Sequence, residues 1–95
     1  MDPPSYGRGP NNEVWKFEDS LYTLINACMH ILSEKPLFFL VNSYTTGISS
    51  IVLENILKMT IGKKYQGHLN SGELGLPIKR DNLVLPCGIY ARWDN

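Results

Sequence analysis

The stretch PLFFLVNS, residues 36–43, decides the fold class. Its centre, Leu37 to Val41, is a continuous apolar run that is rich in aromatic side chains and bounded by Pro36 and Asn42. A short run of this kind predicts a strand buried on both faces, although periodicity alone would also allow a buried helix. We therefore expect a sheet at the centre of the chain.

Segments with helical spacing of apolar residues lie on both sides of this strand. The stripe between Val14 and Leu32 predicts one helix, which should end before Pro36. A second helix is expected from about Thr46 to Thr60, and Gly62 can end it. The apolar stripe expected for this second helix consists of Ile48, Ile51, Val52, Asn55, Ile56 and Met59.

Glycine and proline punctuate the last third of the chain into short extended pieces. The pieces 76–79 and 83–85 flank Arg80-Asp81-Asn82, which predicts a hairpin turn, and 88–93 predicts a further strand. The expected fold class is therefore α+β, with two amphipathic helices packed on a small, mostly antiparallel sheet. Residues 1–12 contain proline, glycine and asparagine without an apolar period, so we expect a disordered, flexible tail ahead of a single domain at 13–95.

Composition narrows the choice of partners. Nine basic and nine acidic residues cancel, which argues against binding nucleic acid with a basic surface, and no specific nucleic-acid sequence is expected as a partner. Weak self-repulsion and a small core instead favour a homo-oligomer. Cys28 and Cys87 lack metal-ligand spacing and are expected to be reduced thiols. Residues 1–12 show no secretory signal, so a cytoplasmic location is expected.

Pro3-Pro4-Ser5-Tyr6 is the motif with the clearest chemistry. Polyproline II has three residues per turn, so Pro3 and Tyr6 would point the same way. Two prolines pre-order the backbone, and the tyrosine offers a flat ring and a hydroxyl. A WW domain recognises this combination in an aromatic-lined groove. Pro3, Pro4 and Tyr6 are therefore the predicted partner-binding residues.

This motif ahead of a compact α+β domain resembles small viral matrix proteins, such as those of rhabdoviruses. The resemblance implies a late-budding motif that recruits WW-containing ubiquitin ligases of the Nedd4 type, and a location at the inner face of host membranes and in the virion. Residues 37–42 after a helix also look like part of autophagy-related ubiquitin-like modifiers. The N-terminal hairpin of that fold and its terminal glycine have no counterpart here.

Other candidate sites have simpler interpretations. Lys58, Lys63 and Lys64 suit the negative end of a helix, and their functional alternative is a patch for anionic lipid or a viral nucleocapsid. His68 and Cys87 would make a catalytic pair only if the fold brought them together. No catalytic residue, metal site or cofactor is otherwise indicated.

These observations predict a non-catalytic, matrix-type viral structural protein that self-associates and recruits a host WW-domain ligase to promote budding. The first alternative is a small adaptor that docks WW domains and has no role in a particle. The second is a small enzyme subunit that uses His68 and Cys87.

Overall fold

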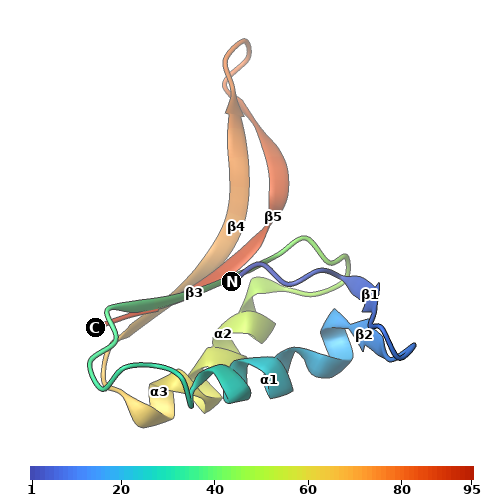
Figure 1. The fold of residues 1–95 in the computed structure, drawn as a ribbon. Coiled ribbons are helices and arrows are strands. Elements are labelled where there is room, and N and C mark those ends of the chain that lie inside the picture. Colours follow the sequence, from blue (N-terminus) through green and yellow to red (C-terminus); the bar gives the residue numbers. More distant parts are fainter.

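The computed structural model describes residues 1–95 and confirms the α+β class (Figure 1). The elements in chain order are β1 (Tyr6–Arg8), β2 (Val14–Lys16), α1 (Phe17–Cys28), β3 (Phe38–Ser43), α2 (Ser50–Met59), α3 (Ile61–Lys64), β4 (His68–Ile78) and β5 (Leu83–Asp94). Strands β3, β5 and β4 form an antiparallel sheet in that order, and β1 pairs with β2 in a separate ribbon. None of the helices is long and apolar enough to cross a bilayer.

The helices cover one face of the three-stranded sheet (Figure 1). Successive side chains of a strand point to opposite faces, so the register assigns every sheet residue to one side. Val41, Ala91 and Trp93 share the covered face and are 0–1% exposed. They pack with apolar residues of the helices, Phe17, Leu21, Ile25, Met29, Leu53, Leu57 and Ile61, in a single core.

No helix covers the other side of the sheet, which we call the open face. It carries Phe38 and Leu40 of β3, followed by Tyr90, Arg92 and Asp94 of β5. Further along β4 and β5 the same face carries large aliphatic side chains, namely Leu74, Leu76, Ile78, Leu83 and Leu85. Strand β3 was expected to be buried on both faces, yet Phe38 is 59% exposed and Leu40 is 37% exposed.

Strands β4 and β5 extend beyond β3 as a two-stranded arm (Figure 1). The predicted turn at 80–82 lies at the tip of this arm, and Asn82 adopts a positive φ of 51° there. The short pieces expected in this region are parts of two long strands. Their register shifts by one residue at Leu74/Gly75, a bulge that places Cys87 without a partner.

The first helix is shorter than its apolar stripe predicts. Val14–Lys16 pairs with β1 instead, and beyond Cys28 the backbone tightens, because His30 and Ile31 donate to the carbonyls of Ala27 and Cys28. These three-residue bonds are those of a 3₁₀ turn, which commonly ends an α-helix.

The buried side of α2 also differs from the predicted stripe. Leu53 and Leu57 are fully buried, whereas Ile51 and Val52 are 64% and 44% exposed. The side of α2 that carries Leu53 faces the sheet. Because apolar residues occur on several sides of this segment, helical periodicity alone could not identify the buried side. Thr60 interrupts the helix by donating to the carbonyl of Ile56 (2.8 Å), so Gly62 falls inside the short helix α3.

Candidate functional site

The chain start lies beside β3 and runs parallel to it. The amino group of Met1 donates to the carbonyl of Leu40 (2.6 Å), and the amide of Asn42 donates to the carbonyl of Met1 (3.2 Å). Bonds to two alternate residues of a neighbouring strand are the parallel pattern. In sheets with parallel strands, ligands bind outside the carboxyl ends of the strands. The segments that follow Met1 and β3, residues 2–6 and 44–49, are therefore the candidate site.

Hydrogen bonds tie these two segments together. The side-chain amide of Asn42 donates to Asp2 (3.0 Å), and the hydroxyls of Ser5 and Thr45 share a bond of 2.7 Å. The amide of Thr45 donates to the buried hydroxyl of Ser43 (3.0 Å). The carboxyl end of β3 is thus held to the start of the chain by side chains that are about forty residues apart in the sequence.

A cleft of about 570 Å³ opens between these segments and the start of α1. Its most prominent side chains are Tyr6 and Tyr44, which are 54% and 60% exposed. Lys16 and Glu18 bring one positive and one negative charge. The remaining lining residues are small or polar, apart from one isoleucine: Ser5, Thr45, Thr46, Gly47 and Ile48. The cleft therefore offers two flat rings together with groups that bind ions and hydrogen-bond partners.

A second cleft, of about 380 Å³, is lined by Asp2, Pro3 and Trp15 among others. The indole of Trp15 donates to the carbonyl of Pro4 (2.6 Å), and the amide of Phe17 donates to the carbonyl of Ser5 (3.0 Å). These bonds hold in place the segment 2–6, whose residues line both clefts.

The predicted docking motif therefore occupies a different setting from the flexible tail that we expected. Pro3 is buried, Pro4 is held through its carbonyl, and Tyr6 begins β1. Sequence composition missed this because the contacts of residues 1–6 are with Trp15, Leu40, Asn42 and Thr45, all distant in the chain. Docking of a WW domain through Pro3, Pro4 and Tyr6 stays a prediction, and it requires this segment to leave its place.

The three candidate lysines do not form one patch of unpaired charge. Lys58 pairs with Glu54 at 2.9 Å, and Lys64 donates to the carbonyl of Met29 (3.0 Å) while lying 5.3 Å from the ring centre of Tyr65. Lys63 and Lys64 lie in the last turn of α3, where a positive charge suits the helix end. Binding of anionic lipid or a nucleocapsid by this group stays a prediction.

The structure keeps His68 and Cys87 apart. His68 pairs with Asp94 across β4 and β5, and Cys87 lies seven residues before Asp94 on β5. At about 3.3 Å per residue the two side chains are roughly 20 Å apart, so they form no catalytic pair. The imidazole of His68 instead lies 3.7 Å from the carboxylate of Asp94.

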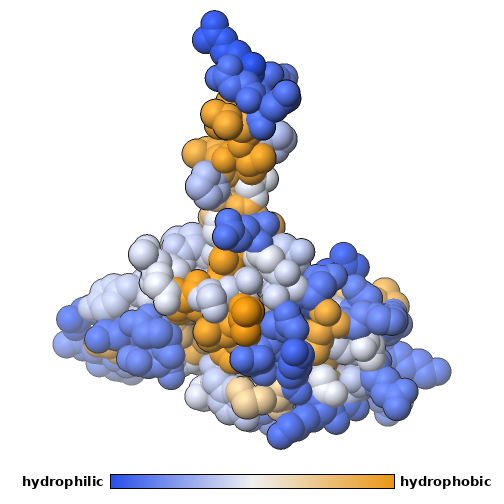
Figure 2. All heavy atoms as spheres, turned by 180° about the vertical axis from the view of Figure 1, so that it is seen from behind, coloured by the Kyte–Doolittle hydropathy of each residue, from blue (hydrophilic) through white to orange (hydrophobic).

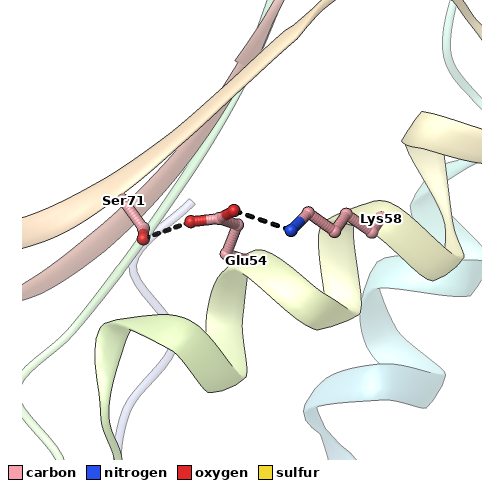
Figure 3. A network of polar contacts seen from close by, with 3 residues as sticks. All are labelled: Glu54, Lys58 and Ser71. Carbon is pink, nitrogen blue, oxygen red and sulfur yellow. Dashed lines mark hydrogen bonds and ion pairs between the residues drawn. The ribbon is translucent and has the colours of Figure 1, made fainter.

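Glu54 links α2 to the sheet on the covered face (Figure 3). Its carboxylate accepts a hydrogen bond of 2.5 Å from the hydroxyl of Ser71 and pairs with Lys58. The bond from Ser71, followed by the contact with Lys58, holds the pKa of Glu54 below its usual value. This network positions β4 and lies away from both clefts.

The chain is similar to proteins of known structure. No family model and no curated protein matches the chain. A SAM-dependent methyltransferase from Agrobacterium tumefaciens, known from its crystal structure, is 30% identical and superposes with a TM-score of 0.82. The match covers 98% of this chain and 31% of the methyltransferase. The chain thus spans about a third of the length of that protein.

This likeness corrects the functional predictions. The resemblance to viral matrix proteins was wrong, because the chain shares its fold over nearly its whole length with a methyltransferase. The prediction of a non-catalytic structural protein that promotes budding was therefore wrong, and so were the adaptor alternative and the prediction that the protein is not an enzyme. Self-association and a cytoplasmic location stay untested predictions.

Sequence reasoning missed Ser5, Tyr44 and Thr45 as cleft residues. In the sequence, Asn42 served only as the boundary of the apolar run 37–41. The usable signal was the position of residues 42–46 at and after the end of the predicted strand, where the carboxyl-end rule places binding groups. That rule needs a parallel neighbour, and the hydrogen bonds of Met1 could not be inferred from the sequence.

Proposed function

We propose that this chain forms part of a SAM-dependent methyltransferase and contributes the cleft beyond the carboxyl end of β3. The observation that carries the proposal is the 30% identical methyltransferase structure that matches 98% of the chain. The position of the cleft adds support, because it lies beyond the carboxyl end of β3, next to the parallel bridge that Met1 makes with this strand. Since the match covers 31% of that enzyme, the chain would act together with the remainder of such a protein.

The cleft residues suit the reactive end of S-adenosylmethionine. When bound, this cofactor supplies a methyl group on a positively charged sulfur atom. The faces of Tyr6 and Tyr44 attract cations, and the carboxylate of Glu18 adds a negative charge. These are the residues that would hold the sulfonium end.

The same residues would also bind and orient the acceptor. An aromatic ring offers a flat surface for a planar group, and the hydroxyl of Thr46 can donate or accept a hydrogen bond. The hydroxyls of Ser5 and Thr45, which share a hydrogen bond, line the same cleft.

The test is a chimera in which this chain replaces the matched third of the Agrobacterium methyltransferase. We expect it to bind tritiated S-adenosylmethionine in equilibrium dialysis and to transfer the label to RNA, DNA or protein. Tyr44→Ala should lower the transfer rate at least about tenfold, which corresponds to about 1.4 kcal/mol of transition-state binding.

The matched control is Tyr22→Ala, which removes a ring that is 45% exposed on α1, outside the cleft. It should leave binding and transfer unchanged. A folded chimera that binds no S-adenosylmethionine would sink the proposal, and so would equal losses in the two tyrosine variants.

A further inference from the structure

We infer that the chain forms a two-fold dimer in which the outer edge of β4 pairs with the same edge of a second copy. The two sheets then join into one continuous antiparallel sheet. None of the residues that line the larger cleft belongs to β4, so the inference goes beyond the proposed function and does not depend on it.

Strand β4 is the sheet edge that no other part of the chain pairs with. The sheet has the order β3–β5–β4, so β3 and β4 are its two edges. On the outer side of β3, Met1 already bonds to Leu40 and Asn42. The edge of β4 is therefore the one that is available to a second chain.

The bonding pattern determines which groups of β4 face outward. The amide of Asn95 donates to the carbonyl of Leu37 (3.2 Å) at the end of the β3–β5 ladder. Bonded and unbonded pairs alternate along an antiparallel ladder, so alternate residues of β5, starting at Asp94, direct their backbone groups to β4. Their partners on β4 are every second residue from His68 onward. The residues between these direct their amides and carbonyls outward: Leu69, Ser71 and Glu73.

This part of the edge lacks the features that normally prevent strands from pairing. Prolines, lysines and bulges commonly protect an exposed edge. The segment HLNSGEL, residues 68–74, contains none of them, whereas the arm beyond it has the bulge at Leu74/Gly75 and then Pro77. Figure 2 shows apolar side chains along the arm below its hydrophilic tip, and these stand on the faces of the strands rather than at their edge. We therefore expect pairing over residues 69–73 and not along the arm.

The edge is complementary to itself in one antiparallel register. With the two-fold axis at Ser71, each Ser71 pairs with its equivalent and each Leu69 pairs with the partner's Glu73. All outward residues are then matched, and each matched pair exchanges two backbone hydrogen bonds. This register also keeps the two Glu73 carboxylates apart, whereas an axis at Glu73 would place like charges directly opposite each other.

The flank of α2 next to this edge suits the same pairing. Glu54 accepts a hydrogen bond from Ser71, so the side of α2 that carries Glu54 and Lys58 lies toward β4 (Figure 3). Helical spacing places Ile51 on the same side, and it is 64% exposed. Because α2 packs under both β4 and β5, the two α2 axes of a dimer would approach to about 10 Å, the distance at which helices pack.

The charges at this contact cancel. Each copy brings the carboxylate of Glu54 and the ammonium group of Lys58, which lie 2.9 Å apart. A two-fold axis beside Ser71 makes the two helices antiparallel, so each Lys58 can reach the partner's Glu54 as well as its own. The whole chain carries no net charge, so long-range repulsion does not oppose association. A second copy supplies both the matching register and the matching charges, and we therefore assign the edge to it rather than to an unrelated strand.

Sedimentation velocity of the full chain at rising concentration tests the dimer, and we expect a monomer–dimer equilibrium. Glu73→Pro removes an outward amide from each copy and should raise the dissociation constant at least about tenfold. Glu73→Ala is the matched control, because it also removes the carboxylate but keeps the amide. It should change the dissociation constant less than about twofold.

A charge change on α2 gives a second test that does not alter the backbone. Lys58→Glu would gather carboxylates from both copies around the axis, so it should raise the dissociation constant at least about fivefold, and more so at low salt. Lys35→Glu makes the same change at an exposed position between α1 and β3. It should leave the dimer unchanged.

Amide hydrogen exchange locates the pairing directly. The outward amides of Leu69, Ser71 and Glu73 should become more protected as the protein concentration rises. The amides of Asn70 and Gly72, which bond to β5 within each copy, should exchange at the same rate throughout.

Two outcomes would overturn the inference. One is a chain that stays monomeric up to about 1 mM. The other is a dimer that dissociates on Leu85→Lys but tolerates both Glu73→Pro and Lys58→Glu, since its contact would then lie on the open face of the arm.

Discussion

The two faces of the three-stranded sheet differ in how far they are covered. On the covered face, Val41, Ala91 and Trp93 are sealed under the helices. On the open face, Leu76 and Leu85 stand more than half exposed. Apolar residues on both faces are typical of sheets that are covered on both sides. The difference teaches that the stability of this fold comes from one face, and that the other face remains available for assembly.

Removal of a side chain from each face should give the largest contrast. Trp93→Ala empties a buried site on the covered face and should lower the free energy of unfolding by about 3–5 kcal/mol. Leu85→Ala, on the open face, should cost less than about 1 kcal/mol. Urea titration followed by circular dichroism measures both. Equal losses would show that the arm already packs against something in solution.

A backbone clash should have the next largest effect. Gly88 has a φ of 149°, and a side chain there would overlap the carbonyl of Ser43. Gly88→Ala should therefore destabilise the chain by about 1–3 kcal/mol and loosen the join between the arm and the end of β3. Gly7→Ala is the matched control, since its added methyl group meets open space. Thermal unfolding of the two variants measures the difference. A Gly88→Ala variant as stable as the wild type would contradict this account.

The link between α2 and β4 should show a pH dependence. Because the pKa of Glu54 is lowered in the fold, its carboxylate stabilises the chain above the usual value of 4.5, and this contribution is lost as the pH falls below that value. The difference in unfolding free energy between wild type and Glu54→Gln should shrink between pH 7 and pH 3. If this difference in unfolding free energy grew as the pH fell, the pKa of Glu54 would be raised in the fold rather than lowered.

The smallest effect on the isolated chain should come from a charge on the open face. Leu76→Lys lies at a position that is 59% exposed, so it should change the unfolding free energy by no more than about 0.5 kcal/mol. It should also reduce binding of 1-anilinonaphthalene-8-sulfonate, because it interrupts the aliphatic surface of the arm. Dye fluorescence measured beside Ile51→Lys tests this. An unchanged signal would place the dye elsewhere.

Local patterns predicted the elements that local forces determine. The aromatic run at 37–41, the hairpin turn at 80–82 and the two longer helical stripes all correspond to observed elements. The helix ends and the buried side of α2 were harder to predict, because they depend on the position of the sheet. The sequence did not predict the full length of β4 and β5, because Pro77 and Pro86 interrupt a strand pattern. The strands tolerate these prolines because their backbone nitrogens point away from the neighbouring strand of the arm.

The candidate site was beyond local patterns. The motif at residues 3–6 has the composition of a mobile peptide, and only contacts with Trp15, Asn42 and Thr45 fix it beside the cleft. Tyr44 carried no signal of its own. Its place in the cleft depends on the parallel bridge at Met1, which joins residues that are 39 positions apart.

That bridge also sets an order of events in folding. The β4–β5 arm closes through neighbouring residues, and hairpins of this kind form within about 1–10 μs. The bonds between Met1 and β3 must close a loop that contains all of α1, which costs more chain entropy before any contact is gained. We therefore expect the cleft to be assembled last and to open first, so that its amide hydrogens exchange with solvent well before those beneath the helices.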